Sequence, residues 1–138
     1  MEAKTFLKQY QEALVDVRNL EAETEELETI ALSITVSTDG ERVQSSGSKD
    51  RMGELIAKIC DMKIELMNKR SQALDKLREV GWVIRQVDNK NYRQLLHRRY
   101  IEGNTWERIA VEMEMNYRWI LRMHGKALEK VEEILNKP

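Results

Sequence analysis

Apolar residues recur every three or four positions over the first quarter of the chain. The pattern runs from Tyr10 to Ile34, with Thr24 as its one polar interruption. Spacings that alternate between three and four place side chains on one face of a helix, as in a coiled-coil seam. The sequence therefore predicts a first helix that ends at about Thr35.

The same rhythm returns after a polar gap. Residues 37–49 read STDGERVQSSGSK, which is rich in Ser and Gly and predicts a mobile loop at about residues 37–49. From Met52 to Val87 the three-four spacing resumes and predicts a second long helix. Two seams of similar length joined by a short connection can cover each other, so we predict an antiparallel helical hairpin over residues 1–87.

Two helices alone leave part of each apolar stripe in water. A third surface is needed, supplied either by the C-terminal region or by a second copy of the chain. Periodicity shows which face is buried but not what covers it, so a monomer and a homodimer formed through the hairpin both fit. We favour the homodimer.

Turn-forming residues then separate the hairpin from a set of shorter helices. Asp88 to Asn91 interrupt the apolar pattern, which places a domain boundary there and predicts a helix-turn-helix domain over residues 88–138. Gly103 is expected to supply a left-handed stop between the first two of these helices. The expected helices are Tyr92–Tyr100, Trp106–Met113 and a segment that begins after the cap Asn116.

The last of these helices is expected to have two contrasting faces. Apolar residues at spacings of three and four form one face, from Ile120 to Ile134, and the opposite face displays basic and aromatic side chains near Arg118 and Arg122. Arginine can read guanine through paired hydrogen bonds, and a helix N-terminus favours phosphate. A tight turn followed by such a helix is the geometry that enters a DNA major groove.

Composition and charge support this division. Only one proline occurs in 138 residues, 41% of the residues are hydrophobic and 34% are charged, so an all-α fold is expected. The net charge is −1, but residues 1–87 hold 13 basic and 16 acidic residues, whereas residues 88–138 hold 10 and 8. Between Asn116 and Ala127 three basic residues face no acidic one, which indicates a local basic surface; a merely solvated face is the alternative.

Several functions are disfavoured by the sequence. No apolar run is long enough to span a bilayer and no signal pattern occurs, so we expect a cytoplasmic protein with no membrane partner. Cys60 stands alone, which excludes an internal disulfide, and we expect it to be a small core residue. His97 and His124 are far apart, so no metal and no cofactor are expected. Paired carboxylates beside lysines indicate solvated helix faces, so the chain is not expected to be an enzyme.

The segment LLHRRYIEGNTWERIAVEMEMNYRWILRMHGKALEKV resembles region 4 of primary sigma factors. The shared features are an arginine-aromatic pair, a T-x-E start, a short turn and a K-A-L ending, over roughly residues 92–135. Over its whole length the chain also looks like small sigma-region-4-like proteins encoded by prophages of Gram-positive bacteria, which are similar to late-transcription regulators of the ArpU and RinA type. The matching positions are Arg99-Tyr100, Thr105-Trp106-Glu107, Met113 to Asn116, and Lys126-Ala127-Leu128.

The resemblance implies recognition of promoter double-stranded DNA, with RNA polymerase as a further candidate partner. It places residues that follow the cap at base edges, Trp119 near the DNA backbone, and Thr105 and Trp106 at a phosphate. Nothing resembles the sigma regions that melt DNA or grip the polymerase core, so an accessory transcription regulator is expected. The implied DNA-binding residues are Thr105, Trp106, Tyr117, Arg118, Trp119, Leu121, Arg122 and Lys126.

The chain departs from the sigma pattern at three positions. Tyr117 and Leu121 stand where arginine or glutamate is favoured, and Glu114 occupies a turn position where glycine or aspartate is commoner. The DNA sequence read is therefore expected to differ from the standard upstream promoter element. Two other functions stay open: a phage DNA-packaging component of the small-terminase kind, and a helical adaptor that binds no DNA.

Overall fold

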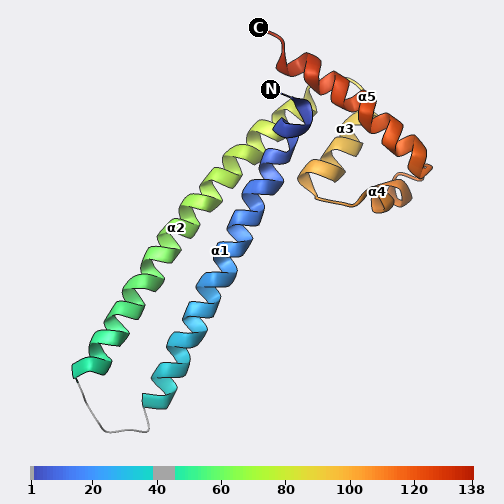
Figure 1. Cartoon of the computed structure of the whole chain (residues 1–138). Coiled ribbons are helices and arrows are strands. Elements are labelled where there is room, and N and C mark those ends of the chain that lie inside the picture. Colours follow the sequence, from blue (N-terminus) through green and yellow to red (C-terminus); the bar gives the residue numbers. More distant parts are fainter. Residues whose placement is uncertain (1, 39–45) are drawn as a thin grey trace. The chain divides into compact units, whose positions relative to one another are not determined.

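The residues that the structure describes form helices and short turns. The computed structural model describes residues 2–38 and 46–138, and side chains within residues 2–36 and 50–138. The predicted all-α fold is confirmed over these residues (Figure 1). The elements are α1 (Ala3–Thr38), α2 (Ser46–Arg85), α3 (Lys90–Leu96), the π-helical turn η1 (His97–Ile101), α4 (Trp106–Glu112) and α5 (Tyr117–Leu135).

The chain groups into two compact units. The hairpin unit comprises Val15–Ser71, and the second unit comprises Met1–Leu14 together with Gln72–Pro138; we call the latter the helix-turn-helix unit only because it contains α4, the turn after it and α5. This grouping differs from the predicted ranges 1–87 and 88–138, because both ends of the predicted hairpin segment belong to the same compact unit as the C-terminal helices. The predicted boundary at Asp88 instead marks the short link between α2 and α3.

The hairpin unit contains the antiparallel helix pair that the two seams predict. Among the described residues of this unit, Glu28 pairs with Lys63 at 3.1 Å and Glu21 with Arg70 at 3.0 Å. The residue numbers rise along one helix as they fall along the other, so α1 and α2 run in opposite directions here. Thr24 is buried in the seam as its polar interruption, and its hydroxyl donates to the Leu20 carbonyl at 2.7 Å.

The helix boundaries in this unit differ from those expected. Helix α1 continues to Thr38 rather than ending at about Thr35, and α2 begins at Ser46 rather than at about Met52. Part of the loop predicted over residues 37–49 is therefore helical, because Ser and Gly disfavour a helix interior by only about 1 kcal/mol or less per residue. The remainder of that prediction, residues 39–45, lies outside the described residues.

Every helical element that the structure describes contributes to the core of the helix-turn-helix unit, as does Val87 in the joint between α2 and α3. Leu7 of α1, Val80 of α2 and Leu95 of α3 are each fully buried, as are Ile109 of α4 and Ile120 of α5. The first turns of α1 are thus part of this core, and the backbone N–H of Ala3 donates to the Glu132 carboxylate of α5 at 2.8 Å. The buried members are Ala3, Leu7, Val80, Val83, Ile84, Val87, Leu95, Leu96, Tyr100, Ile109, Ala110, Ile120, Met123, Ala127 and Val131.

The joint between α2 and α3 is fixed by side chains rather than by regular structure. Arg93 donates through Nη1 to the Val87 carbonyl at 2.7 Å and to the Asp88 carbonyl at 3.0 Å. Asn89 caps α3 by accepting from two backbone N–H groups of its first turn.

Within the described residues, no helix is both long and apolar enough to cross a membrane.

Candidate nucleic-acid interface

Helix α5 has the two faces that its sequence predicts. Ile120, Met123, Ala127 and Val131 are buried at spacings of three and four, which confirms the predicted inner stripe. The basic residues of its first three turns, by contrast, lie on the exposed face. The candidate DNA-contacting side chains exposed on this helix are Tyr117, Arg118, Trp119, Leu121, Arg122 and Lys126.

A tight turn connects α4 to α5 and sets the direction in which α5 begins. Asn116 is its cap, as predicted, and its side chain accepts from the Arg118 backbone N–H at 2.8 Å. Glu114 adopts φ 54°, a left-handed conformation that a residue with a Cβ occupies only at a cost of about 1–2 kcal/mol. The Met115 N–H donates to the Ala110 carbonyl at 3.0 Å and closes the turn. A strained residue is thus held at the tightest point between α4 and α5.

The basic residues of α5 differ in their partners from Arg98 of η1 and Arg108 of α4. Arg98 and Arg108 both bind the Glu112 carboxylate, and the Arg108 contact is 2.8 Å long. The hydrogen bond from Arg108 is the main reason that the pKa of Glu112 is lowered, so this carboxylate stays ionised. Within the described part of the chain, no acidic group lies within 4 Å of Arg118 or Arg122.

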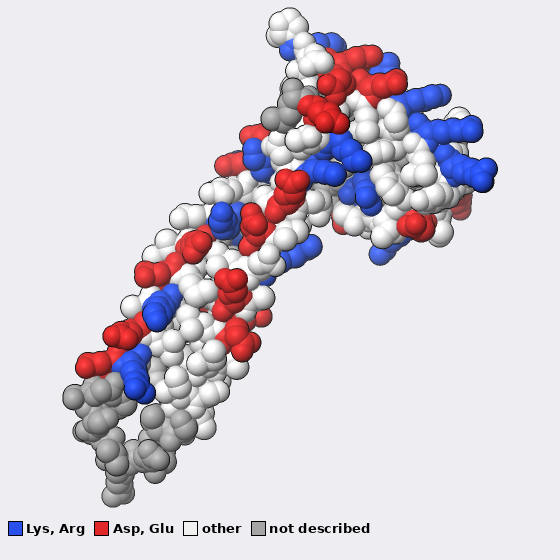
Figure 2. Space-filling model, in the orientation of Figure 1, with Lys and Arg blue, Asp and Glu red and all other residues white. Residues whose placement is uncertain are grey.

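Lysine and arginine side chains gather over the end of α5 that follows the turn (Figure 2). Trp119, half of whose surface is exposed, lies among them, and the Lys126 ammonium is 6.0 Å from the centre of its ring. A shallow pocket of about 150 Å³ adjoins this surface. Its lining residues are Asn89, Asn91, Tyr92, Trp119, Arg122, Met123 and Lys126.

Thr105 and Trp106 are placed differently from the α5 residues. The Thr105 hydroxyl accepts from the Arg108 backbone N–H at 3.2 Å and caps α4. The Trp106 ring is half-buried against the core, with the His124 ring centre at 4.4 Å and the Arg99 guanidinium at 4.4 Å over its face. The structure therefore does not group Trp106 with the exposed face of α5, and its predicted phosphate contact stays a prediction.

His124 belongs to a packed cluster behind the exposed face. Its Nε2 lies 2.7 Å from the Tyr100 hydroxyl, so the two side chains share a hydrogen bond. Burial, together with the positive charges of Lys4 and Arg99, lowers the pKa of His124 to about 4. Burial also raises the pKa of Tyr100 to about 12, although Arg99 acts in the opposite direction. Both groups are thus neutral at physiological pH.

The π-helical turn η1 was not predicted from the sequence. The backbone N–H of Glu102 donates to the His97 carbonyl at 3.0 Å, five residues back. Gln11 of α1 donates its side-chain amide to the Ile101 carbonyl at 2.8 Å and to the Tyr100 carbonyl at 3.3 Å. The chain then reverses at Gly103, whose φ of 74° confirms the predicted left-handed stop.

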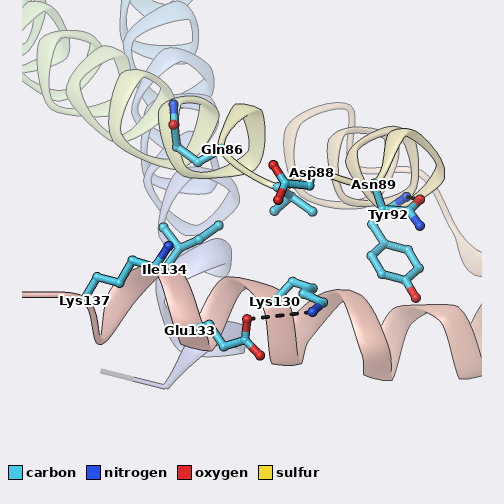
Figure 3. A pocket seen from close by; sticks show the side chains of 9 residues that line it. Gln86, Asp88, Asn89, Tyr92, Lys130, Glu133, Ile134 and Lys137 are labelled. Carbon is cyan, nitrogen blue, oxygen red and sulfur yellow. Dashed lines mark hydrogen bonds and ion pairs between the residues drawn. The ribbon is translucent and has the colours of Figure 1, made fainter.

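A second hollow in this unit lies between α5 and the α2–α3 joint, and its volume is about 260 Å³ (Figure 3). Two lysines and two carboxylates line it, and Lys130 is 3.8 Å from Glu133. The positive and negative charges around this hollow therefore balance, so it attracts an anion much less than the exposed face of α5 does. Its lining residues are Gln86, Val87, Asp88, Asn89, Tyr92, Lys130, Glu133, Ile134 and Lys137.

The expectation that Cys60 is a core residue is wrong, because Cys60 is exposed on α2. The apolar seam of α2 follows other positions, and Cys60 falls outside it. Among the residues that the structure describes, no group of three His, Cys, Asp or Glu side chains is placed to hold a metal ion.

Comparison of the chain with protein-family models, with curated proteins and with solved structures finds no match. The resemblance to sigma region 4 therefore remains an expectation carried by the motif residues.

Proposed function

We propose that this chain binds double-stranded DNA and reads its major groove with the first three turns of α5. The observation that carries the proposal is the pair of exposed arginines on α5, Arg118 and Arg122, which lie one helical turn apart without an acidic partner within 4 Å among the described residues. Cations left unpaired on a surface attract a polyanion, and counterion release from DNA adds to the affinity. An α-helix together with its side chains is narrow enough to fit the major groove of DNA.

The side chains of this face divide into two roles in the proposed complex. Arg118 and Arg122 contact base edges, where a guanidinium can form two hydrogen bonds to guanine. Tyr117 and Leu121 offer apolar contact to neighbouring bases, such as a thymine methyl group. Lys126 lies one turn further along and contacts the phosphate backbone, with Trp119 beside it.

The biological role that we propose is accessory regulation of transcription from a prophage, in the cytoplasm, with RNA polymerase as a candidate partner. The support is the region-4-like motif from Arg99 to Leu128 together with the turn and the faces of α5. In this proposal the chain performs no catalysis. Binding of DNA is the property to test first, because the regulatory role requires it.

The test begins with selection of bound sequences from random DNA at a stated salt concentration, followed by binding titrations on the selected site. We expect the Arg118→Ala, Arg122→Ala double variant to bind this site at least ~30-fold more weakly than the parent, since each paired contact to guanine contributes about 1–3 kcal/mol. Lys126→Ala should weaken binding to all sequences alike and reduce the log–log salt slope by about one.

A matched control removes two positive charges elsewhere. Arg18 and Arg51 are exposed in the hairpin unit, so the Arg18→Ala, Arg51→Ala double variant has the same net charge as the α5 variant. The control should bind like the parent. Equal binding by the parent and the α5 double variant, with helical content unchanged, would show that this face does not read DNA.

A further inference from the structure

The hairpin unit carries a second apolar stripe on α2, apart from the seam that faces α1. Leu66 belongs to the seam and is only 6% exposed. Ile56, Cys60, Ile64 and Met67 follow one another at intervals of four, four and three, and lie about a third of a turn away around the helix. All four are exposed, and the exposed fraction of the surface is 52% for Ile56, 59% for Ile64 and 67% for Met67.

A stripe of this kind is unusual on a chain that stays alone in water. Apolar residues at three-four spacing mark a face that is covered, and large exposed apolar patches mark interaction sites. A helix with two such stripes can pair with one neighbour along each of them. Helix α1 covers the first stripe, so the second has room for another helix.

The two edges of the stripe carry opposite charges. Lys63 and Arg70 lie along one edge, and Glu54 and Asp61 lie along the other. Lys63 and Arg70 already contact glutamates of α1, but their side chains are 57% and 54% exposed and remain accessible to a second carboxylate. Glu54 and Asp61 are exposed as well.

This arrangement of charge selects both the partner and its direction. When two copies of α2 pair in parallel, the basic edge of each lies against the acidic edge of the other. When they pair antiparallel, the two basic edges face each other and the two acidic edges face each other. The stripe is thus complementary to itself in the parallel direction.

We propose that this stripe is the interface with a second copy of the chain, in which the two α2 helices pair in parallel and in register about a two-fold axis. A two-fold axis along the pair places every stripe residue opposite its equivalent. The Cys60 thiols of the two copies therefore face each other. This proposal is independent of DNA binding and is tested without DNA.

The first experiment measures the mass of the full chain in reducing buffer by sedimentation velocity, up to on the order of 100 μM. We expect a reversible monomer–dimer equilibrium, and we expect the Ile64→Glu, Met67→Glu double variant to raise the dissociation constant at least ~30-fold. Both positions are exposed in the single chain, so the variant keeps its fold, which circular dichroism verifies.

A control introduces one glutamate at an exposed apolar position elsewhere in the hairpin unit. Ile30 is 46% exposed and follows Glu28 by two residues, which places it on roughly the opposite side of α1 from that ion-paired glutamate. Ile30→Glu should leave the dissociation constant unchanged. A chain that stays monomeric throughout, or a dimer that Ile30→Glu weakens as much as the stripe variant does, would overturn the assignment of this face.

The second experiment tests direction and register through Cys60. Diamide accepts the two electrons and two protons released when two thiols join, and a covalent dimer should appear on a non-reducing gel. The comparison is a Cys60→Ser, Ala22→Cys variant, which moves the single cysteine to an exposed position of α1 outside the stripe. A dimer whose Cys60 thiols cross-link no faster than those of this variant would rule out parallel pairing in register.

Discussion

The neutral state of His124 should make the stability of the helix-turn-helix unit depend on pH. Burial lowers the pKa of this histidine from 6.5 to about 4 in the folded chain, so the unfolded chain takes up the proton more readily. Stability is therefore fully present above about pH 6.5 and is lost as the pH falls towards 4. The direction is the reverse of that for a histidine stabilised by a carboxylate.

The size of the effect follows from the same values. A difference between 6.5 and about 4 corresponds to at most ~3.4 kcal/mol, at 1.36 kcal/mol per pH unit. His124 is only half-buried, so solvent screening reduces the loss to about 1–2 kcal/mol. A loss of this size is a substantial part of the stability of a small domain.

Urea unfolding at pH 7.5, 5.5 and 4.5 measures how much free energy of unfolding the parent loses. The same measurement is made on the His124→Gln variant for comparison. Glutamine does not titrate but can still form a hydrogen bond with the Tyr100 hydroxyl, which lies 2.7 Å from Nε2 in the parent. The variant should lose less stability than the parent between pH 7.5 and 4.5. In a His97→Asn background the remaining histidine can be titrated by NMR, and a pKa of 6 or above for His124 would refute the reasoning.

Two further substitutions test the turn and the π-helical segment. Glu114→Gly should stabilise the chain by about 0.5–1 kcal/mol in thermal unfolding, because glycine adopts the left-handed conformation without a Cβ clash, whereas Glu114→Ala should bring no such gain. Gln11→Ala should destabilise it by about 1–2 kcal/mol, because the Tyr100 and Ile101 carbonyls lose their donor, and the exposed neighbour Glu12→Ala serves as the control. An effect of Gln11→Ala no larger than that of Glu12→Ala would contradict this account of the segment.

Local patterns in the sequence were sufficient for the helices and for the faces of α5. Three-four spacing depends only on the rotation per residue, so Ile120 to Val131 could be assigned to the core without knowledge of the partner helices. Asn116 and Gly103 were identified for a similar reason, since a cap and a left-handed stop are short-range features.

Features that depend on distant partners could not be predicted in this way. The Gln11 amide and the Ile101 carbonyl are 90 residues apart in sequence, and nothing near either residue indicates their contact. The π-helical turn belongs to the same class, because Gln11 satisfies carbonyls at its end. Cys60 was assigned to the core by its residue type, although its position in the helix places it off the inner seam.

The burial of Leu7 beside residues of the last helix has a consequence for synthesis. Ala3 and its partner Glu132 are 129 residues apart, so at ordinary rates of translation roughly ten seconds separate their emergence from the ribosome. During that interval the apolar side chains at the start of α1 have none of their partners on α5. The nascent chain can complete this core only after α5 has emerged, and until then its first turns are available to chaperones.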